Sequence, residues 1–179
     1  ELENRTPKIV KEKGLAHIPE NRHKRATIDD FTVEENMALG LQDQYSKGAL
    51  LDYGLIEKKT KEYIDKYDIR PQDGKIKFGG LSGGNQQKVV IAKWLEQNSN
   101  ILIFDEPTRG IDVGAKSEIY SLMNELVAQG KSIIMISSEL TEILRMSDRI
   151  VVMCEGRKTG ELDISQATQE RILALATDR

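Results

Sequence analysis

The sequence is short of several residue types, and each shortage excludes a class of protein. Its single cysteine, Cys154, allows no disulfide within the chain. The longest apolar runs, such as 101–104 and 150–154, are the length of strands and far too short to cross a bilayer. The net charge of -3 at pH 7 argues against a surface that coats nucleic acid. The two histidines, His17 and His23, lack the spacing to cysteines or paired carboxylates that would suggest a metal site.

A complete phosphate-binding loop of the form Gly-x-x-x-x-Gly-Lys-Ser/Thr is also absent from the sequence. Gly130-Lys131-Ser132 ends like one, but Glu125 stands where the first glycine is required. The tripeptide also follows a predicted helix and enters a predicted strand, which reverses the required order. We therefore interpret it as a turn.

What the sequence does contain is centred on Leu81-Ser82-Gly83-Gly84-Asn85-Gln86-Gln87-Lys88. Ser82 is suited to cap a helix predicted over about 84–97, whose first N–H groups would then point at an anion. Gly83 and Gly84 would let the main chain approach that anion closely. Taken alone, the stretch is weak evidence for an anion site, because most such turns are ordinary helix caps.

The first hundred residues predict a short α/β part followed by a helical lobe. Thr6-Pro7 begins a short helix ending at Gly14, and the capping box of Thr32 and Glu35 begins another. The remaining expected elements are a buried strand over 15–18, a polar and basic loop over 19–25 interpreted as a solvated turn, a helix over 51–67 and a loop over 69–78.

From Asn100 onward, strand and helix patterns alternate. Buried strands are predicted over 101–104, 132–136 and 149–153, helices over 113–128 and 139–146, a returning hairpin strand over 158–162, and a last helix from 165 to about 176. Repeated strand-helix units predict a parallel sheet with right-handed crossovers.

Two adjacent carboxylates, Asp105 and Glu106, directly follow the first of these strands. Open α/β sheets bind ligands at the carboxyl ends of their strands. Asp105 would suit Mg²⁺, which prefers oxygen ligands, and Glu106 would suit a general base acting on water. From this run alone, the alternative that one of them caps the next element stays open.

In order and spacing, these motifs resemble the nucleotide-binding domain of ABC transporters over essentially the whole chain. The resemblance is carried by 81–88, 105–112, 147–150 and 155–157. The first two stretches are similar to the second ATPase cassette of bacterial ribose, galactose and xylose importers, whose polypeptides carry two cassettes. The resemblance implies a P-loop NTPase-like (RecA-like) α/β core, truncated at its N-terminus, with an inserted α-helical subdomain.

The resemblance also implies a domain organisation and a role for each motif. Residues 1–30 would be partial ATPase core, 31–98 the helical subdomain with the ABC signature, and 99–179 the core with the Walker B, D-loop and switch regions. Ser82, Gly83 and Gly84, with Gln86 beside them, match the signature that reaches ATP on a partner cassette; Asp105 matches the Walker B aspartate at magnesium, Glu106 the catalytic glutamate, Asp112 the D-loop aspartate, Glu20 the Q-loop position and Ser138 the position of the switch histidine.

The chain departs from the common family pattern at two of these positions. Glu20 replaces the Q-loop glutamine and Ser138 replaces the switch histidine, as in second cassettes of the sugar subgroup. The Walker A loop would lie upstream of residue 1. We therefore expect this fragment alone neither to bind ATP tightly nor to hydrolyse it, and to expose apolar surface of its sheet and helices.

The resemblance implies the ATPase subunit of a bacterial importer, with ATP and Mg²⁺ as cofactors and a monosaccharide as cargo. Its expected partners are an N-terminal cassette of the same polypeptide or a second copy, transmembrane permease subunits and, indirectly, a solute-binding protein, but no nucleic acid. The expected location is peripheral, at the cytoplasmic face of the bacterial inner membrane. A nucleoside importer, whose cassettes are similar around 18–25 and 31–37, and a catalytically degenerate regulatory cassette remain open alternatives.

Overall fold

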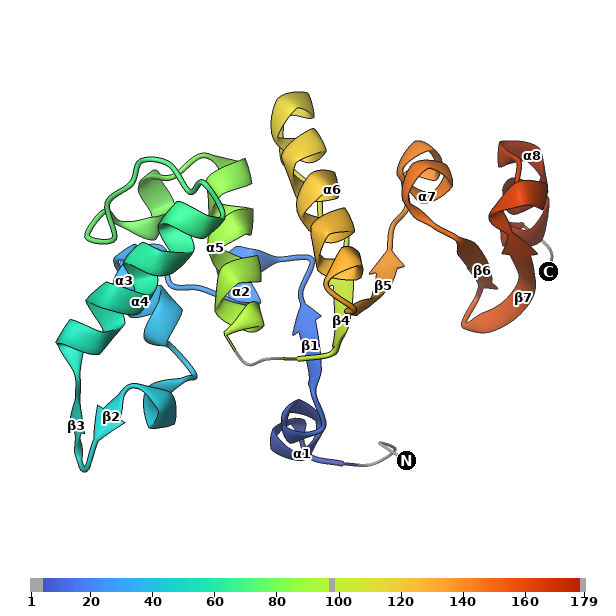
Figure 1. The fold of residues 1–179 in the computed structure, drawn as a ribbon. Coiled ribbons are helices and arrows are strands. Elements are labelled where there is room, and N and C mark those ends of the chain that lie inside the picture. The colour runs from blue at the N-terminus through green and yellow to red at the C-terminus, as the bar shows by residue number, and fades with distance from the viewer. Residues whose placement is uncertain (1–4, 97–98, 178–179) are drawn as a thin grey trace. The chain divides into compact units, whose positions relative to one another are not determined.

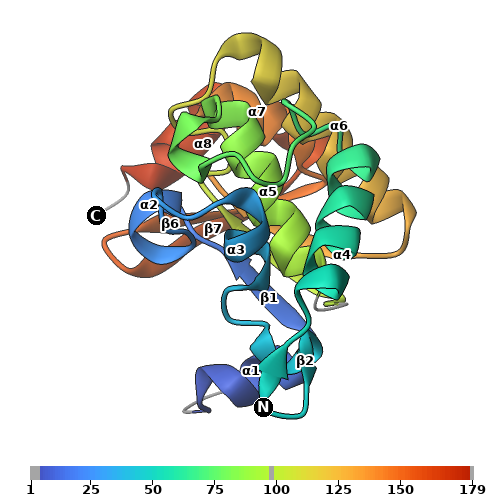
Figure 2. The same cartoon turned by 90° about the vertical axis from the view of Figure 1, so that its left-hand side faces the viewer.

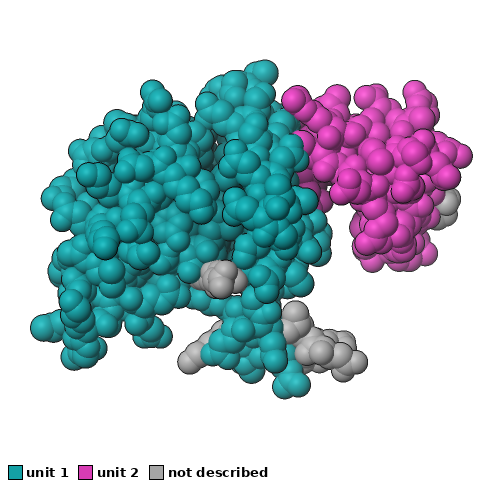
Figure 3. Space-filling view, viewed as in Figure 1, with its two compact units in different colours: residues 1–134 teal, residues 135–179 magenta. Residues whose placement is uncertain are grey.

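The computed structural model describes residues 5–96 and 99–177 of the chain. The chain divides into two units, residues 1–134 and 135–179, which are coloured separately in Figure 3. We describe each unit by itself. The three parts expected from the sequence, 1–30, 31–98 and 99–179, were defined by function and remain a prediction.

The first unit is an α/β arrangement joined to a helical region (Figure 1). Its helices are α1 (Pro7–Glu12), α2 (Arg22–Arg25), α3 (Val33–Ala38), α4 (Tyr53–Lys66), α5 (Gly83–Leu95) and α6 (Val113–Ala128), with short 3-10 turns at Gln42–Gln44 and Phe78–Gly80. Its strands are β1 (Leu15–Ile18), β2 (Ser46–Lys47), β3 (Leu50–Leu51), β4 (Ile101–Asp105) and the start of β5 (Ser132–Ile136).

The main sheet has the strand order β1-β4-β5. β1 pairs with β4 in parallel, from Leu15 opposite Ile101 to Ile18 opposite Phe104. Because these strands lie far apart in the sequence, a crossover connection must join them, and the helical region provides it. The predicted parallel α/β sheet is confirmed.

The apolar runs of these strands predicted burial on both faces of the sheet. This prediction is wrong. In β4, Leu102 and Phe104 are fully buried whereas Ile101 is 39% exposed. In β5, Ile134 and Ile136 are about half exposed. Successive strand residues point to opposite faces, so this alternation means that one face of β4 is covered and the other is not, among the residues that the structure describes. The expected exposure of apolar sheet surface is thus observed.

Helix α5 is the central helix of the first unit and contacts β1, α3 and α6 (Figures 1 and 2). Residues 89–92 on it are completely buried. The helix begins at Gly83 behind its cap, Ser82, close to the predicted start. The capping box of α3 is also confirmed, since Thr32 accepts from the Glu35 amide while the Glu35 side chain accepts from the Thr32 amide.

Two local predictions in this unit are wrong. The expected loop over 19–25 contains α2, a short helix capped by Asn21, and its residue Arg22 is only 9% exposed, so this segment is not a solvated turn. The helix expected from residue 51 begins at Tyr53 because the Asp52 side chain caps it and Leu51 pairs with Ser46 in the β2–β3 hairpin.

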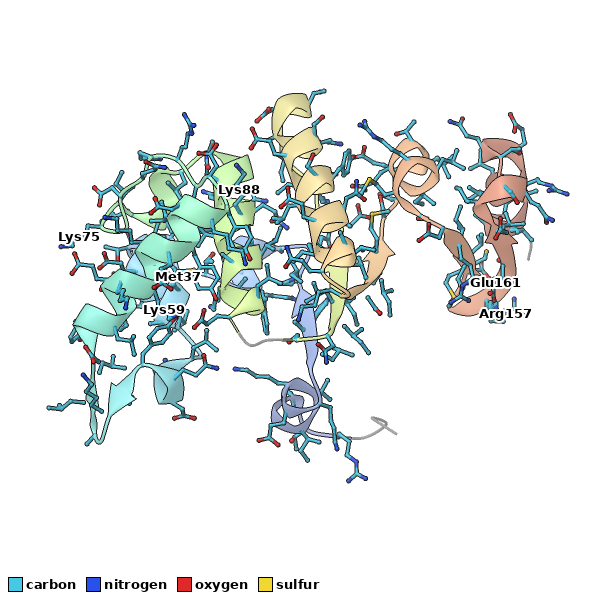
Figure 4. All side chains as sticks on the ribbon, viewed as in Figure 1. Met37, Lys59, Lys75, Lys88, Arg157 and Glu161 are labelled. Carbon is cyan, nitrogen blue, oxygen red and sulfur yellow. The ribbon has the colours of Figure 1, made fainter. Side chains whose placement is uncertain are left out.

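The second unit is a β-hairpin packed with helices. It contains α7 (Leu140–Met146), β6 (Arg149–Cys154), β7 (Arg157–Asp163), a 3-10 turn (Ile164–Gln166) and α8 (Gln169–Ala176). The predicted hairpin is confirmed, since β6 pairs antiparallel with β7. These two strands form a sheet of their own and are not part of the parallel sheet. Ile150, Val152 and Ile172 form its core, and Arg149 forms an ion pair of 2.6 Å with Glu161, which Figure 4 labels on β7. No helix in the described ranges is long and apolar enough to span a membrane.

Asn36 on α3 fixes the loop that precedes the helical region. Its side chain is fully buried, accepts a hydrogen bond from the Ile28 amide at 2.8 Å and donates to the carbonyls of Ile28, Phe31 and Thr32 at 2.9, 3.3 and 3.0 Å. One amide thus satisfies four backbone groups, which folded proteins seldom leave buried and unpaired.

We predict that Asn36→Leu lowers the free energy of unfolding by about 2–4 kcal/mol, because several buried backbone groups lose their partner. Trp94, the single tryptophan, lies in the same unit and reports unfolding in denaturant by its fluorescence. The same change at Asn124, exposed on α6, should shift stability by less than about 0.5 kcal/mol. Equal effects of the two substitutions would contradict the role given to the buried amide.

Candidate functional site

The first turn of α5 carries the Ser-Gly-Gly sequence and lies beside an open cleft. The Ser82 hydroxyl accepts a hydrogen bond from the Asn85 side-chain amide at 2.9 Å and a longer one of 3.4 Å from the Asn85 backbone N–H. The Asn85 oxygen accepts in turn from the Arg70 backbone N–H at 2.7 Å. Ser82 itself is exposed. The cleft, of about 590 Å³, is lined by Arg70, Pro71, Gln72, Gly80, Leu81, Ser82 and Asn85. The Ser82 cap is therefore open to a ligand.

The two glycines of this turn are required by packing within the chain. A Cβ atom on Gly84 would lie 2.5 Å from the Ala115 Cβ on α6, closer than two such atoms can approach. A Cβ on Gly83 would lie 3.0 Å from the Gly110 carbonyl oxygen and 3.2 Å from Nη2 of Arg22. The helix start thus fits tightly against the loop that leads into α6. Close approach to an anion, the role expected for the same residues from sequence, remains a prediction.

Lys88 holds the same pair of helices together one turn later. Its ammonium lies 2.6 Å from Oε2 of Glu118 on α6 and donates to the Asp68 carbonyl at 3.0 Å (Figure 4). Lys88 is buried and Glu118 is more than half exposed. Removing one partner of an ion pair lowers stability most when the charge left behind is buried. The stretch 81–88 therefore packs against α6 at Gly84 and is held to it again at Lys88.

Asp105 lies at the carboxyl end of β4, as the strand prediction required, and His17 lies next to it. Nε2 of His17 is 3.6 Å from Oδ2 of Asp105, and both side chains are partly exposed. No sequence pattern indicated this pair, because it depends on the parallel register that places His17 opposite Ile103. Among the described residues, no three His, Cys, Asp or Glu side chains gather to hold a metal ion. A single carboxylate still suits Mg²⁺ that is shared with phosphates, as this ion is commonly bound.

Glu106 has a backbone conformation that non-glycine residues rarely adopt. Its φ of 48° lies in the left-handed region, which costs of the order of 1–3 kcal/mol and is concentrated at functional sites. The Glu106 carbonyl accepts from the Arg109 N–H at 3.1 Å, so a tight turn directly follows β4. This turn sets where the Glu106 carboxylate projects relative to the end of the strand.

Glu20 and Asp112 both have partners inside the first unit. Glu20 forms an ion pair with Arg109, which joins the segment after β1 to the loop after β4. Asp112 caps α6, accepting from the Ala115 N–H at 3.0 Å. Arg22, which was not among the residues selected from the sequence, donates from Nη1 to the Arg109 carbonyl at 3.4 Å.

Gln86 is buried, and both ends of its side-chain amide are hydrogen-bonded within the chain. Its oxygen accepts from Nε of Arg22 at 3.0 Å, and its nitrogen donates to the Phe78 carbonyl at 3.4 Å. Gln86 thus supports the turn that contains Ser82, and its expected contact with a cofactor remains a prediction.

Ser138, which the sequence resemblance matches to the position of the switch histidine, lies in the second unit between β5 and α7. Its neighbour Ser137 donates to the Glu142 carboxylate and accepts from the Glu139 N–H at 3.0 Å, which fixes the turn. Ser138 and these neighbours all belong to the second unit.

Solved structures define the class of this fold. An ATP-binding cassette of an ABC transporter superposes with a TM-score of 0.78 at 20% identity, covering 99% of this chain and 74% of that one. A cassette solved as a dimer in a post-hydrolysis state with ADP and Pi gives a TM-score of 0.70 at 24% identity, covering 88% of this chain and 66% of that one. At these identities the likeness establishes the fold, that of an ATP-binding cassette.

The chain belongs to the ABC transporter family, whose model matches residues 4–109, more than half of its length. A putative ribose/galactose/methyl galactoside import ATP-binding protein of Burkholderia ambifaria is 49% identical over 98% of this chain and 34% of its own length. A ribose import ATP-binding protein of Bacillus subtilis is 49% identical over 97% of this chain and 35% of its own. The chain therefore spans about a third of the curated relatives that it matches.

We predict that Gly84→Ala destabilises the first unit by about 1–3 kcal/mol, because the added methyl group overlaps the Ala115 Cβ. Gly54→Ala on α4, where the added Cβ would lie at an ordinary contact distance of 3.4 Å from Oδ1 of Asp52, should be neutral or stabilising by up to about 1 kcal/mol. Chemical denaturation of both variants measures the difference.

Combining Gly84→Ala with Ala115→Gly removes the overlap, so the double variant should be more stable than the sum of the two single effects predicts. Strict additivity would show that this contact does not limit the position of α5.

Proposed function

We propose that this chain is part of the ATPase subunit of a bacterial ABC importer that couples ATP hydrolysis to uptake of a monosaccharide. The observation that carries the proposal is the 49% identity over 98% of the chain to a putative ribose/galactose/methyl galactoside import ATP-binding protein. The subunit works at the cytoplasmic face of the inner membrane, bound to permease subunits that receive the sugar from a solute-binding protein.

In this proposal, the first turn of α5 serves an ATP molecule held by another cassette. The Ser82 hydroxyl and the N–H groups of Gly83 and Gly84 contact its γ-phosphate. Support comes from the exposure of Ser82, from the adjoining cleft and from the positive end of a 13-residue helix, which favours negative charge. The other cassette is the N-terminal one of the same polypeptide or a second copy.

The end of β4 supplies the hydrolytic groups. Asp105 would hold Mg²⁺, which when bound offsets negative charge on the phosphates. Glu106 orients the attacking water and takes its proton, and the fixed turn after β4 supports this role because a general base must be held within hydrogen-bond reach. Glu20 and Ser138 take the Q-loop and switch positions, and Asp112 lies at the seam between cassettes.

The experiment that tests this function uses the full-length protein with its permease in membrane vesicles. We predict that Glu106→Gln lowers both ATP hydrolysis and uptake of labelled ribose by at least about 100-fold, because the variant removes the general base without changing side-chain size. Glu125→Gln, an exposed glutamate on α6, is the matched control and should retain both activities.

Undiminished hydrolysis in the Glu106→Gln protein would contradict the catalytic assignment and favour a regulatory cassette. Hydrolysis that drives uptake of a nucleoside and not of a sugar would contradict the proposed cargo while leaving the ATPase assignment intact.

We further predict that Ser82→Arg, in the same full-length protein, lowers hydrolysis at the partner's ATP site by at least about tenfold, because a bulky cation replaces the hydroxyl at the cap. Folding of this half should persist, since Ser82 is exposed. Ser121→Arg, also exposed but on α6, should leave hydrolysis unchanged. An active Ser82→Arg protein would contradict the shared site.

A further inference from the structure

Arg22 is a buried cation whose hydrogen bonds go to neutral oxygens. It is 9% exposed, and its guanidinium donates to the Gln86 side-chain oxygen at 3.0 Å and to the Arg109 carbonyl at 3.4 Å. Burial lowers the pKa of Arg22, an effect that the charge of Asp29 opposes. Burying a cation is costly, and an apolar residue would fill the same space more cheaply. A positional role explains why an arginine is placed here.

The two acceptors of Arg22 belong to two parts of the candidate site, the start of α5 and the loop after β4. Gln86 lies in the first turns of α5, four residues after Ser82, and Arg109 lies in the turn between Glu106 and Asp112. Nη2 of Arg22 is also 3.2 Å from where a Cβ on Gly83 would stand. A planar guanidinium presents its donors in a fixed fork, so it can hold two loops at a set separation.

The segment that carries Arg22 is itself attached to the loop after β4 and to α5. Glu20, two residues earlier, forms an ion pair with Arg109. The Ala26 carbonyl, just after α2, accepts from Nζ of the buried Lys93 at 2.9 Å. Gln86 and Lys93 are about two turns apart on α5, so residues 22–26 are hydrogen-bonded to this helix at two points.

We propose that Arg22 is a positioning residue that sets the first turn of α5 against the loop after β4. It acts through Gln86 and the Arg109 carbonyl, and it connects the Glu20 segment to the turn that contains Ser82. The inference rests on the proposed function, because its consequence is measured as ATP hydrolysis at the shared site. A displacement of Glu20 would move Arg22 and, with it, the turn that contains Ser82.

The test compares Arg22→Lys with Arg25→Lys in the full-length protein. Arg25 is exposed on the same short helix, so it controls for loss of an arginine from α2. Lysine keeps the charge at position 22 but cannot span both acceptors. We predict that Arg22→Lys lowers kcat by at least about tenfold, since small misplacements at a reacting site are costly. The KM for ATP should change by less than about twofold, because Arg22 does not itself contact ATP in this proposal.

Two further measurements separate positioning from a general loss of structure. Hydrogen exchange of the amides in 81–88 should accelerate in Arg22→Lys while the amides of α6 exchange as in the unaltered protein. Gln86→Met should lower kcat similarly, and the Arg22→Lys/Gln86→Met double variant should be no slower than Arg22→Lys alone.

Unchanged kcat in Arg22→Lys, or additive losses in the double variant, would overturn the inference. Loss of exchange protection throughout the first unit would also overturn it, because Arg22 would then be a residue of general stability. Glu106→Gln, measured in parallel, separates this failure from failure of the proposed function. If Glu106→Gln is inactive and Arg22→Lys is fully active, only the role of Arg22 is wrong.

Discussion

The close approach of the first turn of α5 to the start of α6 is the constraint on which the site depends. Space between Gly84 and Ala115 is so limited that no side chain fits at position 84. The ion pair of Lys88 and Glu118 holds the same two helices together farther along. Because α6 follows directly from the loop after β4, fixing α5 against α6 also fixes the turn that contains Ser82 relative to that loop. A close-packed contact thus places two loops that are far apart in the sequence.

Features governed by neighbours in the sequence could be predicted. The capping box of Thr32 and Glu35, the start of α5 after Ser82 and the end of β4 at Asp105 all depend on local spacing, and the structure contains each of them. The family resemblance, likewise carried by short motifs, is confirmed by the family match. The burial of β4 and β5 was not predictable in this way, because an apolar run indicates a strand but not which of its faces other elements cover.

The same distinction explains which site residues were missed. His17 meets Asp105 only through the register of β1 and β4, which no local pattern specifies. Arg22 lies in a basic stretch that favoured a solvated loop, and its burial follows from acceptors 64 and 87 residues away. The left-handed backbone of Glu106 also lacked a sequence signal, since glycine and asparagine are the residues that usually mark that conformation. Long-range packing decided the first two.

The glycines have a packing role beside the ligand role proposed for them, and this determines how the site can be dissected. A side chain at Gly84 would overlap Ala115 and one at Gly83 would crowd the Gly110 carbonyl, so lost activity would not separate a packing defect from a lost phosphate contact. Ser82 differs because its side chain is exposed and its bonds are confined to its own turn, with Asn85. The ligand role and the packing role of this turn therefore separate at Ser82. The chemistry proposed for the signature rests on that residue more firmly than on the glycines that define it in sequence.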